Sequence, residues 1–144
     1  MSIALPGPAD VAELLTFLPR FREAGFQAWL GSNSTTDPVT GRYIWIGPLY
    51  HPAVVEFFKV LNRPCWLDKR YQPEQCEVWI RDRQIIATAD LAAIRAMLTY
   101  CNRLERVSEG TWGTSVQEGY IDALLVRLEQ LAAESRNQVA TRRS

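Results

Sequence analysis

The sequence predicts an α+β fold, a mostly helical single domain of four to five helices with a small antiparallel β-hairpin packed on the helices. Three observations support this prediction. Apolar residues recur at intervals of three and four in several segments, which is typical of amphipathic helices. The segment 26–50 is instead rich in strand-forming residues on either side of a turn-forming stretch. With 144 residues, the chain is long enough for one domain with its own core.

The clearest helical patterns lie between Thr88 and Leu131, and we expect the rest of the chain to pack around them. The first of these helices can be capped by Thr88 or Asp90. Its apolar stripe consists of Leu91, Ile94, Met97, Leu98, Cys101 and Leu104. The stripe of the last helix consists of Ile121, Leu124, Leu125, Leu128 and Leu131. Between the two helices, Gly119 indicates a break at the end of a polar connection.

Further helices are predicted upstream of this pair. The first begins near Pro8, which suits a first helical turn, and Pro19 ends or kinks it. The second begins at His51 and is apolar on more than one face, so we expect it to be largely enclosed. A weaker helix is predicted from Pro73, within a segment, 62–87, whose pattern does not define its secondary structure.

The predicted hairpin occupies Phe26–Tyr50. Strand-type residues lie at Trp29 and Leu30 and again at 43–46, and the stretch between them contains the turn-forming pair Asp37-Pro38. This pattern predicts two strands joined by a long, exposed loop. Because an isolated two-stranded hairpin is marginally stable in water, we expect it to pack on the helices.

The pattern predicts one globular domain over residues 1–134. Residues 135–144 carry no apolar stripe, so we expect a flexible C-terminal tail. No apolar run approaches the roughly 18 residues that a membrane span needs, and Pro6 and Pro8 interrupt the N-terminal segment where a signal peptide would lie. The three cysteines form no CxxC pair, which favours reduced thiols. We therefore expect a cytoplasmic protein with no membrane partner.

Charge and composition bear on the class of ligand. Lys+Arg and Asp+Glu each number 16, and this balance disfavours duplex nucleic acid as a partner because phosphate contacts need clustered cations. Weak binding of single-stranded nucleic acid remains an alternative, through Lys69, Arg70 and Arg81 with aromatic residues between them. The other interpretation of this region is a solvated face with aromatic residues in the core.

The densest polar cluster surrounds Trp112 in the connection between the two central helices. Paired carboxylates can act as general acid and base, so one hypothesis is a small hydrolase or lyase that uses Glu109 and Glu118, with Arg106 holding an anion. The alternative is that Arg106 and Glu109 form a structural pair, which is the commoner role of such residues. No serine-nucleophile or phosphate-loop motif is present in the sequence.

Metal and cofactor sites are not expected. His51, Cys65, Cys76 and Cys101 are ligand types that zinc accepts. Zinc sites usually take two ligands from a local pair, however, and these residues are widely spaced. We therefore predict no metal and no cofactor.

Several segments of the chain resemble a known family. LLTFLPRF, AWLG, LYHPAVVEFF and IATADLAAIRAMLTYCNRLERVSEG occur in the order found in bacterial and phage proteins grouped as domain of unknown function 6508. The resemblance covers most of Leu14–Leu131 and implies no activity, because none is assigned to the family. The family pattern implies histidines at the positions of Cys101, Thr111 and Tyr120, so this chain resembles a divergent member that lacks them.

The function that these observations favour is a non-enzymatic protein-binding module. One version of this hypothesis is a phage or mobile-element protein that inhibits a host defence complex. We expect the contacts to come from the loop Thr35–Arg42 and from an aromatic groove beside Trp45 and Trp112, since large aromatic side chains are favoured at recognition sites. The predicted binding residues are Asp37, Arg42, Trp45, Arg106, Glu109, Trp112 and Tyr120.

Overall fold

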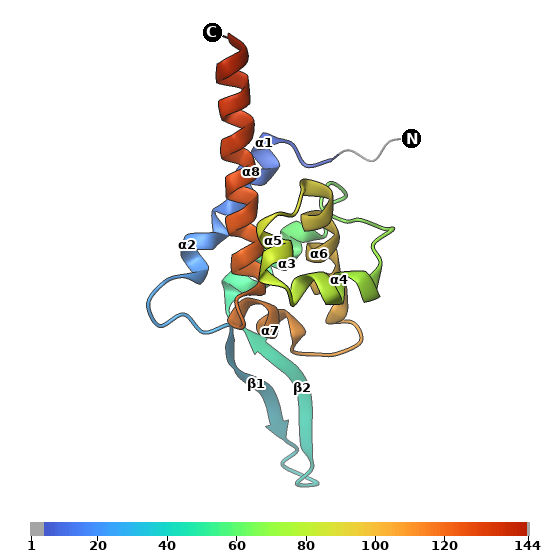
Figure 1. The fold of residues 1–144 in the computed structure, drawn as a ribbon. Coiled ribbons are helices and arrows are strands. Elements are labelled where there is room, and N and C mark those ends of the chain that lie inside the picture. The colour runs from blue at the N-terminus through green and yellow to red at the C-terminus, as the bar shows by residue number, and fades with distance from the viewer. Residues whose placement is uncertain (1–4, 144) are drawn as a thin grey trace.

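The computed structural model describes residues 5–143, and their side chains except those of 32–34, 45, 46 and 138–143 (Figure 1). Within this range the fold is α+β. In chain order its elements are α1 (Pro8–Leu15), α2 (Phe17–Phe21), β1 (Trp29–Thr36), β2 (Tyr43–Tyr50), α3 (Pro52–Leu61), α4 (Pro73–Ile80), α5 (Arg83–Ala87), α6 (Leu91–Leu104), α7 (Thr111–Gln117) and α8 (Tyr120–Arg143).

The prediction of four to five helices is wrong, because the described residues form eight. The additional helices are short and arise where a local cap divides a segment. Asp82 separates α4 from α5, since its side chain accepts hydrogen bonds from the backbone N–H groups of Gln84 and Ile85. Gly110 separates α7 from α6 because its φ of 97° lies in the left-handed region that favours glycine.

The core lies around the first half of α8. This helix packs against α1, α2, α5, α6 and α7, so it contacts helices from both ends of the sequence (Figure 1). Of the predicted stripes, the residues that are buried are Ile94, Met97, Leu98, Cys101, Ile121, Leu124, Leu125 and Leu128. The two central helical patterns are therefore confirmed. Beyond the body, α8 continues to Arg143, and the flexibility expected of residues 135–144 stays a prediction.

The hairpin does not pack on the helices as expected. It projects away from the helical body, on the side opposite the C-terminal part of α8 (Figure 1). Strands β1 and β2 are antiparallel and pair from Trp29↔Tyr50 at the base to Thr36↔Tyr43 near the turn. Strands of eight residues span roughly 26 Å at the usual rise per residue. Most of β1 is small or polar and offers no apolar stripe to bury, which accounts for the projection.

The long loop expected between the strands is mostly strand. The ladder continues through polar residues as far as Thr36, so only a short turn remains at the tip. In this turn the N–H of Asp37 donates to the carbonyl of Arg42 at 2.7 Å, and the N–H of Gly41 donates to the carbonyl of Asp37 at 2.8 Å. Gly41 has a φ of 70°, which favours glycine there. The sequence therefore identified the turn-forming residues, but the connection between the strands is shorter than the long loop that was predicted.

The base of the hairpin is anchored tightly in the body. The Tyr50 side chain is buried, and the indole of Trp29 lies directly over Gly113 of α7. A Cβ atom at Gly113 would be 2.3 Å from Cε2 of Trp29, so only glycine permits this approach. At the same level, the N–H of His51 donates to the carbonyl of Ala28 at 2.9 Å. The projecting arm therefore begins at a fixed base.

No helix in the described range is both long and apolar enough to cross a membrane.

Candidate functional site

The connection between α6 and α7 is organised by Glu105. Its carboxylate accepts a hydrogen bond from the Tyr50 hydroxyl, at 2.8 Å to both oxygens, and one from the N–H of Trp112 at 2.9 Å. Longer contacts come from the N–H of Gly110 at 3.3 Å and from Oγ1 of Thr111 at 3.4 Å. The first turn of α7 has backbone N–H groups without intrahelical partners, and a carboxylate satisfies them. Glu105 thus joins the hairpin base to α7.

The Tyr50 hydroxyl is held in its protonated form by the same contact. Burial, together with the hydrogen bond to Glu105, raises the pKa of Tyr50 well above its usual value. A neutral phenol keeps its proton and donates a hydrogen bond to the carboxylate, whereas a phenolate would be repelled by it. This arrangement is that of a structural hydrogen bond rather than of a reactive group.

Trp112 is half-buried and packs against the core. Its ring stacks on Phe58 with centroids 4.8 Å apart and an interplanar angle of 4°. Its indole N–H donates to the carbonyl of Asn102 at 3.0 Å, so the polar end of the ring is satisfied inside the protein. A groove between Trp45 and Trp112 is not defined, since the side chain of Trp45 lies outside the described set.

Tyr120, the first residue of α8, lies at the junction of α5 and α8. The guanidinium of Arg83 lies over its ring, 5.6 Å from the centroid. Arg83 also donates to the carbonyls of Glu118 and Gly119 at 3.1 and 3.0 Å, so it closes the turn between α7 and α8. These contacts assign Tyr120 to helix packing.

The carboxylates of the enzyme hypothesis do not line a common cleft. Glu109 and Glu118 are both exposed, and neither lines either of the two clefts described below. Asp122, one turn beyond Glu118, forms a two-pronged ion pair with Arg22 at 2.8 and 2.9 Å. Of the three predicted catalytic residues, Arg106 lines the second of these two clefts.

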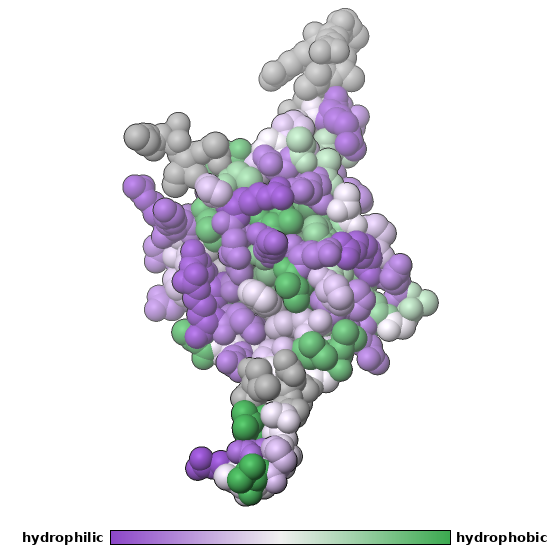
Figure 2. All heavy atoms as spheres, turned by 180° about the vertical axis from the view of Figure 1, so that it is seen from behind, coloured by the Kyte–Doolittle hydropathy of each residue, from purple (hydrophilic) through white to green (hydrophobic). Residues whose placement is uncertain are grey.

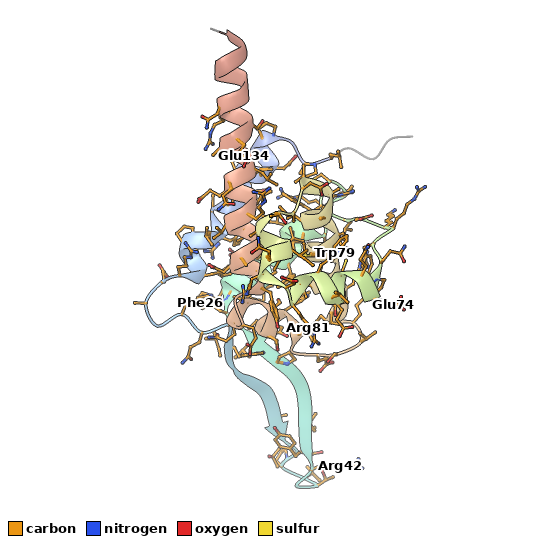
Figure 3. The ribbon with its side chains drawn as sticks, viewed as in Figure 1. Phe26, Arg42, Glu74, Trp79, Arg81 and Glu134 are labelled. Carbon is orange, nitrogen blue, oxygen red and sulfur yellow. The ribbon has the colours of Figure 1, made fainter. Side chains whose placement is uncertain are left out.

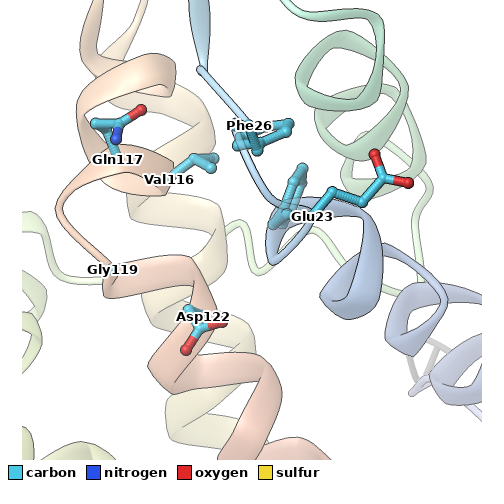
Figure 4. A pocket seen from close by; sticks show the side chains of 8 residues that line it. Glu23, Phe26, Val116, Gln117, Gly119 and Asp122 are labelled. Carbon is cyan, nitrogen blue, oxygen red and sulfur yellow. The ribbon is translucent and has the colours of Figure 1, made fainter.

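The first cleft has a volume of about 280 Å³ and lies beside the turn between α7 and α8 (Figure 4). Its walls include Glu23, Phe26, Gln117 and Asp122. Two of these polar groups already have partners, because Asp122 pairs with Arg22 and the side-chain oxygen of Gln117 accepts from the N–H of Ala28 at 3.2 Å.

The second cleft, of about 360 Å³, lies between the segment 67–71 and the C-terminal half of α6. Its lining residues are Leu67, Asp68, Lys69, Tyr71, Thr99, Arg103, Arg106 and Val107. This cleft brings together Lys69 and Arg106. In the sequence analysis, Lys69 belongs to the nucleic-acid hypothesis and Arg106 to the enzyme and protein-binding hypotheses. Arg81, by contrast, lies on the exposed end of α4 and pairs with Glu77 at 3.1 Å (Figure 3).

The hairpin carries Asp37 and Arg42 at its tip (Figure 3), and the backbone of Trp45 lies on β2, whereas the other predicted binding residues, Arg106, Glu109, Trp112 and Tyr120, lie on the body. Asp37 holds the turn, since its carboxylate accepts from the N–H of Val39 at 2.9 Å, and this bond lowers the pKa of Asp37. Large apolar side chains are exposed along the hairpin (Figure 2). They are Leu30, Val39, Tyr43, Ile44 and Leu49, five of the nine such side chains among the residues described.

The residues considered for zinc have other roles. His51 caps α3, with Nδ1 accepting from the N–H of Ala53 at 3.0 Å. Cys76 and Cys101 are buried, and burial raises the pKa of these thiols to about 11 and about 12. Across the described part of the chain, no group of three His, Cys, Asp or Glu residues is placed to hold a metal ion.

Comparison with known proteins supports a family assignment alone. Searches of curated proteins and of solved structures each found no match to this chain. Residues 7–134 match a family described as "Family of unknown function (DUF6508)". The absence of family histidines at Cys101, Thr111 and Tyr120 stays a prediction. Because the match covers most of the sequence, the chain belongs to this family of unknown function.

Proposed function

We propose that the protein is a protein-binding module whose projecting hairpin, Trp29–Tyr50, is the contact element. The observation that carries this proposal is the concentration of exposed apolar side chains on an arm that does not pack on its own body. Exposed apolar surface of this kind is favoured at protein interaction sites. The proposed occupant of the arm's surface is a partner protein with an apolar groove.

The chemistry of the arm fits insertion into such a groove. Val39 is 90% exposed at the turn, and Tyr43 is 64% exposed at the start of β2. Each side chain of this size contributes roughly 1.5–3 kcal/mol when fully buried. Asp37 holds the turn in shape through its own backbone contacts, so less conformational entropy is lost on binding.

Open strand edges favour the same role. A two-stranded sheet leaves the outer edge of each strand unpaired. Irregular pairing between Trp29 and Ser32, and again between Asn33 and Ser34, interrupts β1. Such irregularities discourage indiscriminate strand addition, so side-chain recognition by the arm is the favoured mode.

The test compares hairpin variants with body variants of equal chemistry. Val39→Ser and Tyr43→Ser remove apolar surface from the arm, whereas Val78→Ser and Val107→Ser remove it from equally exposed positions on the body. Affinity recovery from the native cell, quantified by mass spectrometry, should give a stoichiometric partner with the wild type and both body variants. With each hairpin variant, the amount of recovered partner should fall about tenfold or more, which is the effect expected from the loss of one buried apolar side chain.

Two outcomes would contradict the proposal. One is a partner retained equally by all variants, and the other is a partner lost only with the body variants. Self-association through the hairpin is a separate outcome, detected by light scattering of the purified wild type. The narrower hypothesis of a phage protein acting on a host complex, the hydrolase or lyase hypothesis and the nucleic-acid hypothesis all stay predictions.

A further inference from the structure

The second cleft is lined mainly by positively charged side chains. Three cations, Lys69, Arg103 and Arg106, line it against the single carboxylate of Asp68. The lining therefore carries three positive charges minus one negative, a net of two, in a protein whose formal net charge is zero. The carboxylate of Asp68 is itself engaged, because Oδ1 accepts from the N–H of Arg70 at 2.9 Å.

In the part of the chain whose side chains the structure describes, these cations belong to none of the five ion pairs. Within residues 5–143, the arginines in ion pairs are Arg20, Arg22, Arg63, Arg81 and Arg127. Lys69, Arg103 and Arg106 are absent from that set. A helix C-terminus favours nearby cations and accounts in part for Arg103 and Arg106. It does not account for Lys69, which approaches from a different segment.

A buried arginine adds to the positive potential beneath the cleft. Arg95 is only 7% exposed, and its guanidinium donates hydrogen bonds to the backbone carbonyls of Cys65, Pro64 and Leu67. It lies two turns before Arg103 on the same face of α6, with Thr99 between them at a spacing of four. Carbonyl oxygens satisfy the guanidinium's donors but do not neutralise its charge, and a charge in a low-dielectric interior acts over a longer distance.

The same residues make the cleft rigid. Arg95 donates to the carbonyls of Cys65 and Leu67 at 2.8 and 2.6 Å. Oγ1 of Thr99 accepts from the N–H of Asp68 at 3.0 Å, and its single proton is shared between the carbonyls of Arg95 at 2.9 Å and Trp66 at 3.2 Å. The segment that carries Lys69 is therefore fixed against α6 without any ligand. A preformed site loses little entropy on binding.

We propose that this cleft binds a small phosphate-bearing organic molecule. Its phosphate lies among Lys69, Arg103 and Arg106, and its apolar part contacts Tyr71 and Val107 at the cleft wall. Arginine donors match phosphate oxygens in two-pronged geometry, and lysine adds a point charge. A volume of about 360 Å³ is at the lower end for ligand sites, which fits a nucleotide-sized molecule. This site is separate from the hairpin and independent of the proposed partner binding.

The test is a titration of the full chain, labelled with ¹⁵N, with inorganic phosphate and with adenosine 5′-monophosphate. Saturable shifts are expected at the amides of 67–71 and 103–107, with tighter binding of the nucleotide. Adenosine without phosphate should not bind at the same concentrations. The double variant Arg103→Gln/Arg106→Gln should bind at least about tenfold more weakly, because hydrogen bonds to a charged group are lost.

The controls separate site binding from general charge and from misfolding. Arg42→Gln/Lys59→Gln removes the same charge from exposed positions elsewhere and should leave the affinity unchanged. Val107→Glu keeps every cation and adds a negative charge at the cleft. Because Val107 is 82% exposed, the substitution does not disturb packing, and it should also weaken nucleotide binding. Shifts spread over all basic residues, no saturation, equal binding of adenosine, or equal loss in the control pair would each overturn the proposal.

Discussion

Glu105 is the residue whose removal should cost the fold most among the exposed or half-buried acids. In Glu105→Ala the Tyr50 hydroxyl and the N–H of Trp112 lose their acceptor, and both bonds are short in the wild type. A hydrogen bond to a charged group contributes roughly 1.5–3 kcal/mol. The contacts from Gly110 and Thr111 are longer and count for little. Because water can partly replace the carboxylate at this half-buried position, we expect a loss of about 3 kcal/mol in the free energy of unfolding.

The assay is urea denaturation of the wild type and of three variants. Glu118→Ala removes an exposed carboxylate at the C-terminal end of α7 and should change stability by less than about 0.5 kcal/mol. Tyr50→Phe combined with Glu105→Ala should cost less than the sum of the single changes, since the two residues share one bond. A loss below about 1 kcal/mol for Glu105→Ala, or strict additivity with Tyr50→Phe, would refute the reasoning.

Two further predictions concern packing and alkaline pH. Gly113→Ala should destabilise the protein by about 1–3 kcal/mol, despite the better helix propensity of alanine, because the new Cβ meets the Trp29 indole. Thermal melting measures this loss. Adding Trp29→Leu to the same chain should restore part of it. The free energy of unfolding should fall as the pH rises from about 9 towards 12. In the folded state the thiols of Cys76 and Cys101 have pKa values of about 11 and about 12, so they keep their protons up to those values. In the unfolded chain the same thiols lose their protons near their ordinary pKa of 9.0. In Cys76→Ala/Cys101→Ala that decline should be shallower, and an unchanged slope in denaturation curves would exclude these thiols as its cause.

The parts of the fold that were predictable are those decided by periodic burial. The apolar stripes of α6 and α8 are long, so their pattern identified both helices and most of their buried residues. The short helices were missed because local caps create them. Asp82 and Gly110 mark the starts of α5 and α7, and a single residue of this kind is a weak signal in a sequence.

The position of the hairpin was not predictable from its own residues. General physics favours packing a two-stranded sheet on helices. Here the base alone is fixed, through the contact of Trp29 with Gly113 and the bond of Tyr50 to Glu105. Both contacts join residues more than fifty positions apart, and nothing in local sequence identifies such pairs.

For the candidate sites too, the sequence indicates which residues are present but not which of them come together in space. The sequence shows the polar connection to be dense in charge, and in the structure Glu105 joins the hairpin base to α7 there. Trp112 was expected at a surface groove because of its polar neighbours; in the structure it stacks on Phe58 and is half-buried against the core. The basic cleft was missed as a unit because Lys69 and Arg106 lie on separate segments. The spacing of Arg95, Thr99 and Arg103 by four was the one available signal.

The central claim, that the hairpin is the contact element, is tested most directly by site-specific photo-crosslinking in the native cell. A photoreactive residue at Val39, on the hairpin turn, is compared with one at Val78, on α4. The proposal predicts a discrete crosslinked partner from position 39 that Tyr43→Ser abolishes, and none from position 78. A partner captured from position 78 and not from 39 would contradict it.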